Sequence, residues 1–450
     1  MTNVGLPEEL AVEPIGAPFD VRLRLPGSKS LTNRALLLAA LAEGVSRLDG
    51  VLLSDDTRRM LEALAALGFE IELDEAAPGV VVQGQGGRIP AVRAALHLGN
   101  AGTAYRFLTA ACCLGEPGSA YELSGIARMH ERPIGQLVEP LRQLGARIDY
   151  LGREGYPPVR VQGGGLQGGG LRGGELTLAP TLSSQYLSAL MQVGPYCAQP
   201  LALRFDGPVT SLPYVRMTAG LMRHFGGSVD ADDDFSQVRI DGQRYAGRAY
   251  RVEPDASNAS YFLAAAAALP GSRCVIENLG RSSLQGDVAF LDVLGRMGAR
   301  VEWGEDTMTC VAPADGAPLR GVDVDLNAMP DMAQTLAALA VLAEGDTVIR
   351  NVGNLRVKET DRLAALECEL SKLGATVSVE GDDLYVVPPA DGCIRGAAID
   401  TYDDHRMAMS FAVIGLARPG VTIREPACVA KTFPDYFDYL DRLRAAGGGR

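Results

Sequence analysis

The feature that most constrains the fold of this 450-residue chain is a repeat of apolar helices, each introduced by polar residues. The six stretches begin near residues 28, 99, 183, 255, 329 and 403, at steps of 71, 84, 72, 74 and 74 residues. They are apolar nearly all round, which predicts helices that are buried on every side.

A second series of helices lies between them and is amphipathic, which is typical of surface helices. Each of these ends in a glycine that suits a left-handed C-cap. The glycines are Gly68, Gly145, Gly226, Gly298, Gly374 and Gly447. Short β-rich runs fill the gaps, so the pattern predicts an α/β fold of six units. Each unit reads strand, buried helix, strand, surface helix and further strands.

The sixth unit stops at its surface helix, because the chain ends there. The N-terminal stretches AVEPIGAP and VRLRLPG are the simplest source of its missing strands. We therefore expect one domain of residues 26–249 and a second of residues 1–25 with 250–450. The chain then crosses twice, near 25–26 and 247–254, and clefts between such halves are common ligand sites.

Composition narrows the class of protein. The net charge of −13 disfavours a nucleic-acid partner, because such proteins are normally basic. No apolar run approaches ~18 residues and the N-terminus does not resemble a secretory signal, so we expect no membrane association. Eight cysteines without a CxxC pair predict reduced thiols and a cytoplasmic protein.

The polar helix starts suit anion binding, since a helix N-terminus carries free N–H groups and a positive dipole end. Serine, asparagine and aspartate there are also ordinary N-caps, which is the simpler interpretation of any single start. Capping requires no cation, however, and does not account for Lys29, Arg34 and Arg406.

Three further polar loops, 127–135, 354–363 and 430–436, precede surface helices. The charges of 354–363 also fit a solvated helix start with i,i+3 and i,i+4 pairs. The chain has only four lysines, and all but Lys372 fall in polar motifs. Lys372 is predicted on an outer helix without a special role. His405, between Asp404 and Arg406, is a candidate catalytic residue.

Eight sequence blocks at these helix starts and loops together resemble the signature of the 3-phosphoshikimate 1-carboxyvinyltransferase (EPSP synthase) family. They occur in the order found in that family and cover nearly the whole chain. The blocks are LPGSKSLTNRALLLAALAEG, LGNAGTAYRFLTA, RMHERPIG, SSQYLSALM, DASNASYFLAAAA, NLRVKETDR, DDHRMAM and AKTFPDY. The resemblance implies the two-lobed enolpyruvyl transferase fold, which is like an inverse α/β barrel. Each lobe has three βαβαββ units, and the N-terminal strand lies in the C-terminal lobe.

The resemblance also implies an activity, namely transfer of the enolpyruvyl group of phosphoenolpyruvate to the 5-hydroxyl of shikimate 3-phosphate. The reaction proceeds by addition and elimination through a tetrahedral intermediate. It implies these two small-molecule substrates, no metal or organic cofactor, and a monomer.

Site residues follow from the matched positions. The resemblance implies a catalytic set of Lys29, Asp331, Glu359, His405 and Lys431. It implies a shikimate 3-phosphate set of Lys29, Ser30, Arg34, Ser183, Ser184, Gln185, Ser211, Tyr214, Asp331, Asn354 and Lys358. It implies a phosphoenolpyruvate set of Lys29, Asn100, Gly102, Arg132, Gln185, Arg362, Arg406 and Lys431. Asp331 is the expected base for the hydroxyl and Glu359 the expected acid at the methylene carbon.

The chain departs from the family pattern where Tyr105, Arg106 and Phe107 replace a common Met-Arg-Pro. Two alternatives stay open. UDP-N-acetylglucosamine enolpyruvyl transferase shares the fold, but its mobile loop usually carries a cysteine, and residues 127–135 contain none. A non-catalytic anion-binding protein of this fold would be expected to have lost Asp331, Glu359 and His405.

Overall fold

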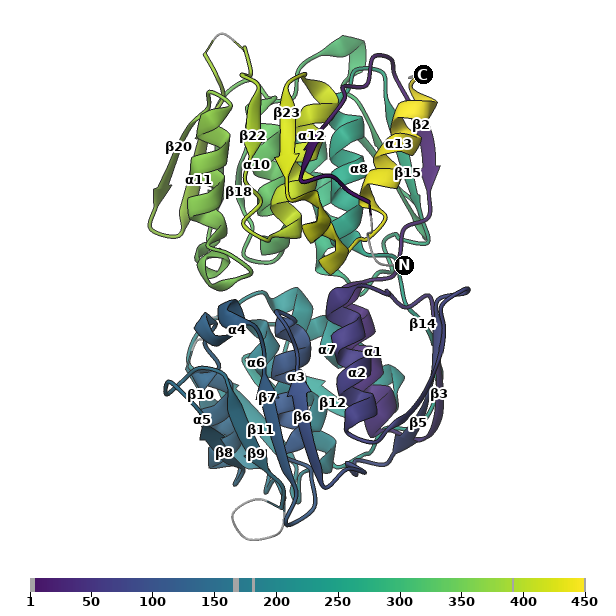
Figure 1. Ribbon diagram of the computed structural model, residues 1–450, viewed down its shortest axis with the longest axis vertical. Coiled ribbons are helices and arrows are strands. Elements are labelled where there is room, and N and C mark those ends of the chain that lie inside the picture. Colours follow the sequence, from purple (N-terminus) through teal and green to yellow (C-terminus); the bar gives the residue numbers. More distant parts are fainter. Residues whose placement is uncertain (1–4, 165–169, 180–182, 391, 449–450) are drawn as a thin grey trace. The chain divides into compact units, whose positions relative to one another are not determined.

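The computed structural model describes residues 5–164, 170–179, 183–390 and 392–448, and the chain divides into two compact units (Figure 1). One unit is the continuous segment Gly27–Val252, and the other combines Met1–Pro26 with Glu253–Arg450. The chain therefore passes from one unit to the other twice, after Pro26 and after Val252.

Each unit contains three small mixed sheets among its described residues, and the sheets share one strand pattern. A parallel pair forms one side, and antiparallel strands continue the sheet on the other side. In Gly27–Val252 the sheets are, in order of pairing, β14 (Ala249–Arg251), β3 (Glu43–Asp49), β5 (Gly79–Gln85), β4 (Glu70–Asp74); β6 (Arg93–His97), β7 (Ala120–Ser124), β9 (Val159–Gln162), β8 (Arg147–Tyr150); and β10 (Gly174–Leu178), β11 (Leu201–Phe205), β13 (Gln237–Ile240), β12 (Val229–Ala231).

The other unit repeats the pattern, except that one sheet has three strands. Its sheets are β2 (Asp20–Leu23), β15 (Arg273–Glu277), β17 (Thr307–Val311), β16 (Arg300–Trp303); β18 (Asp323–Asp325), β19 (Thr347–Arg350), β21 (Asp383–Val387), β20 (Thr376–Glu380); and β22 (Ala397–Ile399), β23 (Val421–Arg424), β1 (Glu9–Ala11).

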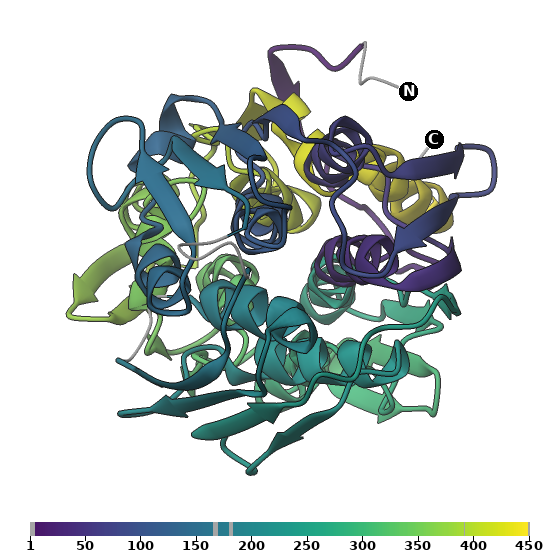
Figure 2. The ribbon, with the colours of Figure 1, turned by 90° about the horizontal axis from the view of Figure 1, so that it is seen from below.

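The six predicted buried helices are all present, and nearly all of their side chains are shielded from water. In Gly27–Val252 the buried helices lie inside the unit's strands, toward the middle of the view in Figure 2. In the other unit the three buried helices contact one another. The six are α1 (Lys29–Leu41), α3 (Gly102–Cys112), α6 (Ser184–Val193), α8 (Ala256–Ala268), α10 (Ala333–Val341) and α12 (His405–Ala417).

The predicted surface helices are also present, and each buries only one side. They are α2 (Asp55–Ala66), α5 (Gly135–Gln143), α7 (Leu212–His224), α9 (Phe290–Arg296), α11 (Arg362–Lys372) and α13 (Tyr436–Ala446). A further short helix, α4, covers Ala127–Glu131. The α/β class with six repeated units is thus confirmed.

The two N-terminal strands do not join the same sheet, which corrects one expectation from the sequence. β1 pairs antiparallel with β23 in the sixth sheet, whereas β2 pairs parallel with β15 in the fourth. Both stretches were predicted to complete the sixth unit.

The repeat itself explains the exchange. In the complete units a strand precedes each buried helix and pairs parallel with the strand that follows that helix, as β6 does with β7 around α3. The strands before the two crossings swap partners: β2 precedes α1 but pairs with β15, and β14 precedes α8 but pairs with β3. The crossings therefore lie between a strand and the helix that follows it.

Close packing of helix on sheet depends on small residues. A Cβ on Gly84 of β5 would come within 2.2 Å of the Ala42 carbonyl oxygen and 2.5 Å of the Ala39 carbonyl oxygen. Only a glycine lets the strand approach the end of α1 so closely. In the part of the chain that the structure describes, no helix has the length and apolar character needed to cross a membrane.

Candidate active site

A carboxylate surrounded by cations forms the centre of the candidate site in the unit that contains residues 253–450. Asp331 lies in the short 3-10 helix η4 (Pro330–Met332), which leads into α10, and its side chain is 18% exposed. Arg406 Nη2 lies 2.7 Å from Asp331 Oδ2, Arg362 Nη1 lies 3.3 Å from Oδ1, and Lys358 Nζ lies 3.7 Å from Oδ1. Residues 358–362 and the start of α12 therefore bring three positive charges to one partly accessible carboxylate.

Arg362, the first residue of α11, connects several carboxylates. Its Nε lies 2.7 Å from Asp404 Oδ2, and its Nη2 lies 2.9 Å from Glu359 Oε2. Burial by itself lowers the pKa of Arg362, but the carboxylates of Asp404, Glu359 and Asp331 raise that pKa above its ordinary value. The guanidinium thus stays charged although its side chain is only 1% exposed.

The start of α12 supplies the second arginine. Asp404 caps the helix by accepting a hydrogen bond from Arg406 N at 2.9 Å. Arg406 also donates from Nη1 to the Tyr261 hydroxyl at 3.2 Å, and His405 Nδ1 lies 3.7 Å from Asp404 Oδ1. The His405 side chain is fully buried. The Asp404 cap therefore places the buried imidazole of His405 and the guanidinium of Arg406 in the first turn of α12.

A further buried carboxyl, Asp287, lies in the same unit. Ser257 donates a hydrogen bond to Asp287 Oδ2 at 2.6 Å. Burial, together with the negative charge of Asp331, raises the pKa of Asp287 to about 6. Burial is the larger cause of this raised pKa, and the nearby negative charge of Asp331 adds to it.

The other expected residues of this unit lie at the ends of short helices. Asn354 is in η5 (Gly353–Val357), and Lys358 follows that helix directly. Lys431 ends η6 (Pro426–Lys431) and is 8% exposed. The structure thus brings Asp331, Lys358, Glu359, Arg362 and Arg406 into one connected cluster.

In the Gly27–Val252 unit, Lys29 is the first residue of α1 and follows its N-cap, Ser28. The Lys29 ammonium lies 3.4 Å from Asp56 Oδ2, and both side chains are largely buried. Asp56 belongs to α2, so this ion pair connects the buried helix with its surface helix.

Arg34 lies one turn further along α1 and is 1% exposed. It donates to Thr218 Oγ1 at 2.7 Å, to Ser188 Oγ at 3.2 Å and to the backbone carbonyl of Tyr214 at 3.3 Å. Burial lowers the pKa of Arg34 to about 10. Its guanidinium also lies 5.2 Å from the ring centre of Phe107, one of the residues that departs from the family pattern.

Arg132 follows α4 and binds the start of α3. Its Nη1 donates to Asn100 Oδ1 at 2.9 Å and to the Asn100 carbonyl at 3.0 Å. A Cβ on Gly102 would come within 2.6 Å of Arg132 Nη2 and of Arg106 Nη1. Two guanidinium groups therefore occupy the space that the missing side chain of Gly102 leaves.

The starts of α6 and α7 complete the expected residues of this unit. Ser183 caps α6, and Gln185 Nε2 donates to Thr103 Oγ1 at 3.2 Å. Ser211 precedes α7 in a left-handed conformation, with φ at 53°. The capping role that the sequence left open is thus observed at Ser28, Ser183, Asp255 and Asp404, each of which accepts a hydrogen bond from its own helix.

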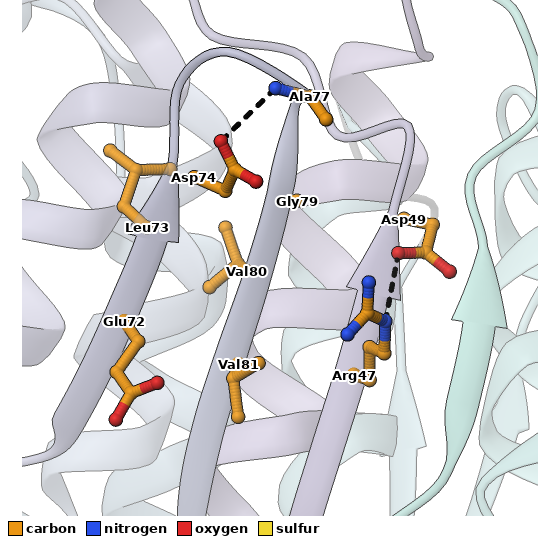
Figure 3. Close-up of a pocket in the computed structure, with 9 residues that line it drawn as sticks. All are labelled: Arg47, Asp49, Glu72, Leu73, Asp74, Ala77, Gly79, Val80 and Val81. Atoms are coloured by element: carbon orange, nitrogen blue, oxygen red, sulfur yellow. Dashed lines mark hydrogen bonds and ion pairs between the residues drawn. The ribbon is translucent and has the colours of Figure 1, made fainter.

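A hollow lies elsewhere, on one face of the β3–β5–β4 sheet (Figure 3). Arg47 pairs with Asp49 at 3.1 Å at one side of it, and Asp74 accepts from Ala77 N at 3.1 Å at the other. None of the expected site residues is among its described lining residues, so the hollow adds nothing to the candidate site.

Sequence reasoning missed Asp56 and Asp404 as ion-pair partners of the expected cations Lys29 and Arg362. It also missed the buried carboxyl of Asp287 near Asp331. The segment SDDTRR around Asp56 looks like any acidic helix start. Asp404 had a usable signal, because it is the N-cap position directly before His405 and Arg406.

The family model of EPSP synthase (3-phosphoshikimate 1-carboxyvinyltransferase) matches residues 15–440. This chain belongs to the EPSP synthase family. The 3-phosphoshikimate 1-carboxyvinyltransferases of Erwinia tasmaniensis and Serratia proteamaculans are each 48% identical over 439 residues, which are 97% of this chain and 99% of each relative.

Solved structures support the EPSP synthase fold. An EPSP synthase structure from Acinetobacter baumannii superposes with a TM-score of 0.77 at 27% identity and covers 97% of this chain and 98% of that one. The chain is therefore a transferase of the EPSP synthase family with that family's fold, as its sequence motifs predict.

Proposed function

We propose that this chain transfers the carboxyvinyl group of phosphoenolpyruvate to the 5-hydroxyl of shikimate 3-phosphate and releases phosphate. The observation that carries the proposal is the accessible carboxylate of Asp331 among three cations, in a chain that matches the family over residues 15–440. Both substrates are anions, so they require such cations, and the hydroxyl requires a base.

In the 253–450 part, the arginines are the proposed phosphoenolpyruvate ligands. Arg362 and Arg406 present planar guanidinium groups that suit carboxylate and phosphate oxygens. Lys431 adds a compact charge. Asp331, Asn354 and Lys358 are proposed to contact shikimate 3-phosphate. In this arrangement the 5-hydroxyl lies near Asp331, the proposed base.

In Gly27–Val252, serines and a lysine at helix starts are the proposed shikimate 3-phosphate ligands. The set is Lys29, Ser30, Arg34, Ser183, Ser184, Gln185, Ser211 and Tyr214. Lys29, Gln185, Asn100, Gly102 and Arg132 are also proposed to contact phosphoenolpyruvate. Arg34 is already engaged by Thr218 and Ser188, which orient its guanidinium.

The proposed chemistry has two balanced steps. In the addition, the hydroxyl oxygen bonds to C2 of phosphoenolpyruvate, the hydroxyl proton passes to Asp331, and C3 takes a proton from Glu359. In the elimination, C3 returns a proton to the Glu359 carboxylate and the C2–C3 double bond re-forms. The C2–O bond to phosphate breaks, and the leaving phosphate takes the proton held by Asp331. Neighbouring cations stabilise the negative charge on phosphate and carboxylate through both steps. His405 and the lysines are proposed to assist these proton transfers.

The first experiment is a phosphate-release assay with both substrates, with the product identified by mass. Release that requires shikimate 3-phosphate and yields the enolpyruvyl product supports the proposal. UDP-N-acetylglucosamine in its place tests the sister activity, and no release with either acceptor would support a non-catalytic anion-binding protein.

Cellular setting and assembly are part of the proposal. We expect a cytoplasmic monomer that binds no nucleic acid and no membrane. The sequence has eight cysteines and no CxxC pair, which supports reduced thiols and a reducing compartment. Light scattering of the purified protein tests the monomer.

A further inference from the structure

One face of α11 is bound along its length to the loop of residues 400–404. Arg362 and Glu369 are seven residues apart, which is two helical turns, so they lie on the same face. Arg362 binds Asp404 at one end of the loop. Glu369 accepts the backbone N–H of Asp400 at 3.0 Å at the other end. The helix thus holds both ends of the 400–404 loop.

Glu369 is a buried carboxylate with several donors. The Tyr402 hydroxyl donates to its Oε1 at 2.6 Å, and the Lys372 ammonium lies 2.6 Å from its Oε2. The same ammonium lies 2.7 Å from Asp400 Oδ2. The Glu369 side chain is 0% exposed, so its charge depends on these partners. Burial and the neighbouring Glu369 carboxylate raise the pKa of Tyr402, which keeps its hydroxyl protonated as a donor.

The loop needs such support because its backbone is strained. Tyr402 and Asp403 are consecutive non-glycine residues with φ at 55° and 53°. Residues with a Cβ avoid this left-handed region unless the surroundings hold them there. In this conformation the hydroxyl of Tyr402 donates to the buried Glu369 carboxylate, so this hydrogen bond stabilises the left-handed backbone.

The strained turn sets the position of the arginines. Directly after it comes Asp404, which caps α12 and binds Arg362, and then Arg406, which binds Asp331 at 2.7 Å. We infer that Glu369, held by Lys372 and Tyr402, is a positioning residue that fixes the 400–404 loop and thereby the two guanidinium groups. It touches no substrate itself.

This inference rests on the proposed function, in which Arg362 and Arg406 bind phosphoenolpyruvate. Its main test is Tyr402→Phe, which removes one hydroxyl and leaves Glu369 and Lys372 paired. The expected result is a rise of about 3- to 10-fold in KM for phosphoenolpyruvate, because small displacements of positioning groups weaken ligand binding. KM for shikimate 3-phosphate should stay within about twofold, since most of its proposed ligands lie elsewhere.

The matched control is Tyr121→Phe. Tyr121 donates to the Ala91 carbonyl at 2.8 Å, in the Gly27–Val252 unit, so it also loses one hydroxyl hydrogen bond. Both variants should unfold at slightly lower temperatures, but only Tyr402→Phe should change KM. Equal unfolding shifts with an unchanged KM in both would show that Tyr402 is merely structural, and the inference would be wrong.

Two further variants separate the inference from the proposed function. Arg406→Lys should raise KM for phosphoenolpyruvate strongly; if it does not, the proposed binding site fails and the inference with it. If it does and Tyr402→Phe does not, only the inference fails. Glu369→Gln places an amide N–H₂ or an uncharged oxygen against Lys372. It should therefore raise the KM for phosphoenolpyruvate more than Tyr402→Phe does. A smaller effect than Tyr402→Phe would contradict the central role of Glu369.

Discussion

At the scale of single residues, Asp331 is the group whose charge matters most. It is the common partner of Arg406, Arg362 and Lys358, so it neutralises part of their positive charge. In the proposed function it also accepts the hydroxyl proton. Removing the negative charge of Asp331 should therefore lower turnover but leave the binding of phosphoenolpyruvate intact or make it tighter.

Asp331→Asn should therefore lower kcat by about 10²- to 10⁴-fold, the usual contribution of a general base. Binding of phosphoenolpyruvate should be retained or tightened, because the neighbouring cations lose a competing carboxylate. Steady-state kinetics and calorimetric titration of each substrate measure both effects. A variant that keeps more than about a tenth of normal turnover would assign the base to another residue.

Lys372 differs from what its sequence context predicts. The sequence predicts it on an outer helix without a special role, whereas its ammonium bridges the buried Glu369 and the partly exposed Asp400. Lys372→Met should lower the free energy of unfolding by about 2 kcal/mol. This lies between the effects of breaking an exposed and a buried ion pair, since the lysine is partly exposed. Urea unfolding measures the loss, with the neighbouring Ser371→Ala as a control that should change little.

At the scale of elements, the sequence pattern predicted the helices well and the strand partners less well. Continuous apolar stretches identify a buried helix by themselves, which is why α1 and α12 were found. Sheet membership is not a local property, however. β2 has the sequence of a strand, but nothing in that sequence records that its partner is β15. The same limit applies to the site, where cations in motifs were recognisable but Asp56 and Asp287 were not.

At the start of α3, Gly102→Ala is expected to weaken the binding of phosphoenolpyruvate without lowering the stability of the protein. Gly102 has no unusual backbone conformation, so alanine suits the helix and should leave the unfolding free energy unchanged or raise it by up to ~1 kcal/mol. Its methyl group would displace the guanidinium groups of Arg132 and Arg106. Gly102→Ala should thus raise KM for phosphoenolpyruvate without loss of stability. A stable variant with normal KM would remove Arg132 from the proposed site.

Between α8 and α9, Asp287 predicts a pH dependence of stability. Its pKa is raised to about 6 in the folded protein from an ordinary 3.8, so the folded state binds the proton more tightly than the unfolded state. The free energy of unfolding therefore falls as pH rises from about 4 to 6 and then levels off. Asp287→Asn keeps the acceptor for Ser257 but cannot ionise.

The free energy of unfolding of Asp287→Asn should consequently exceed that of the parent protein by about 1–3 kcal/mol at pH 7.5 and by little at pH 4.5. The charges of Asp331, Asp255 and Arg406 also act on Asp287, so the comparison is between variant and parent at each pH. Urea unfolding at both values gives the measurement. An equal difference at the two pH values would contradict a raised pKa.

At the scale of the whole molecule, the two crossings determine which pieces can fold alone. Gly27–Val252 is continuous and contains every strand of its three sheets, including β14. The other unit needs the N-terminal segment, because β1 pairs with β23, β2 pairs with β15, and Phe19 and Leu23 lie in its core.

We therefore expect residues 27–252 to fold as an isolated fragment with a cooperative urea transition by circular dichroism. Residues 253–450 should fail to do so. Joining residue 450 to residue 1 through a flexible linker should restore folding, because it returns β1 and β2 to this unit. Trp303, the only tryptophan, lies in this unit and donates to Asp292, so its fluorescence reports on this unit alone. Cooperative folding of 253–450 without the N-terminal strands would show that β1 and β2 are dispensable to its core.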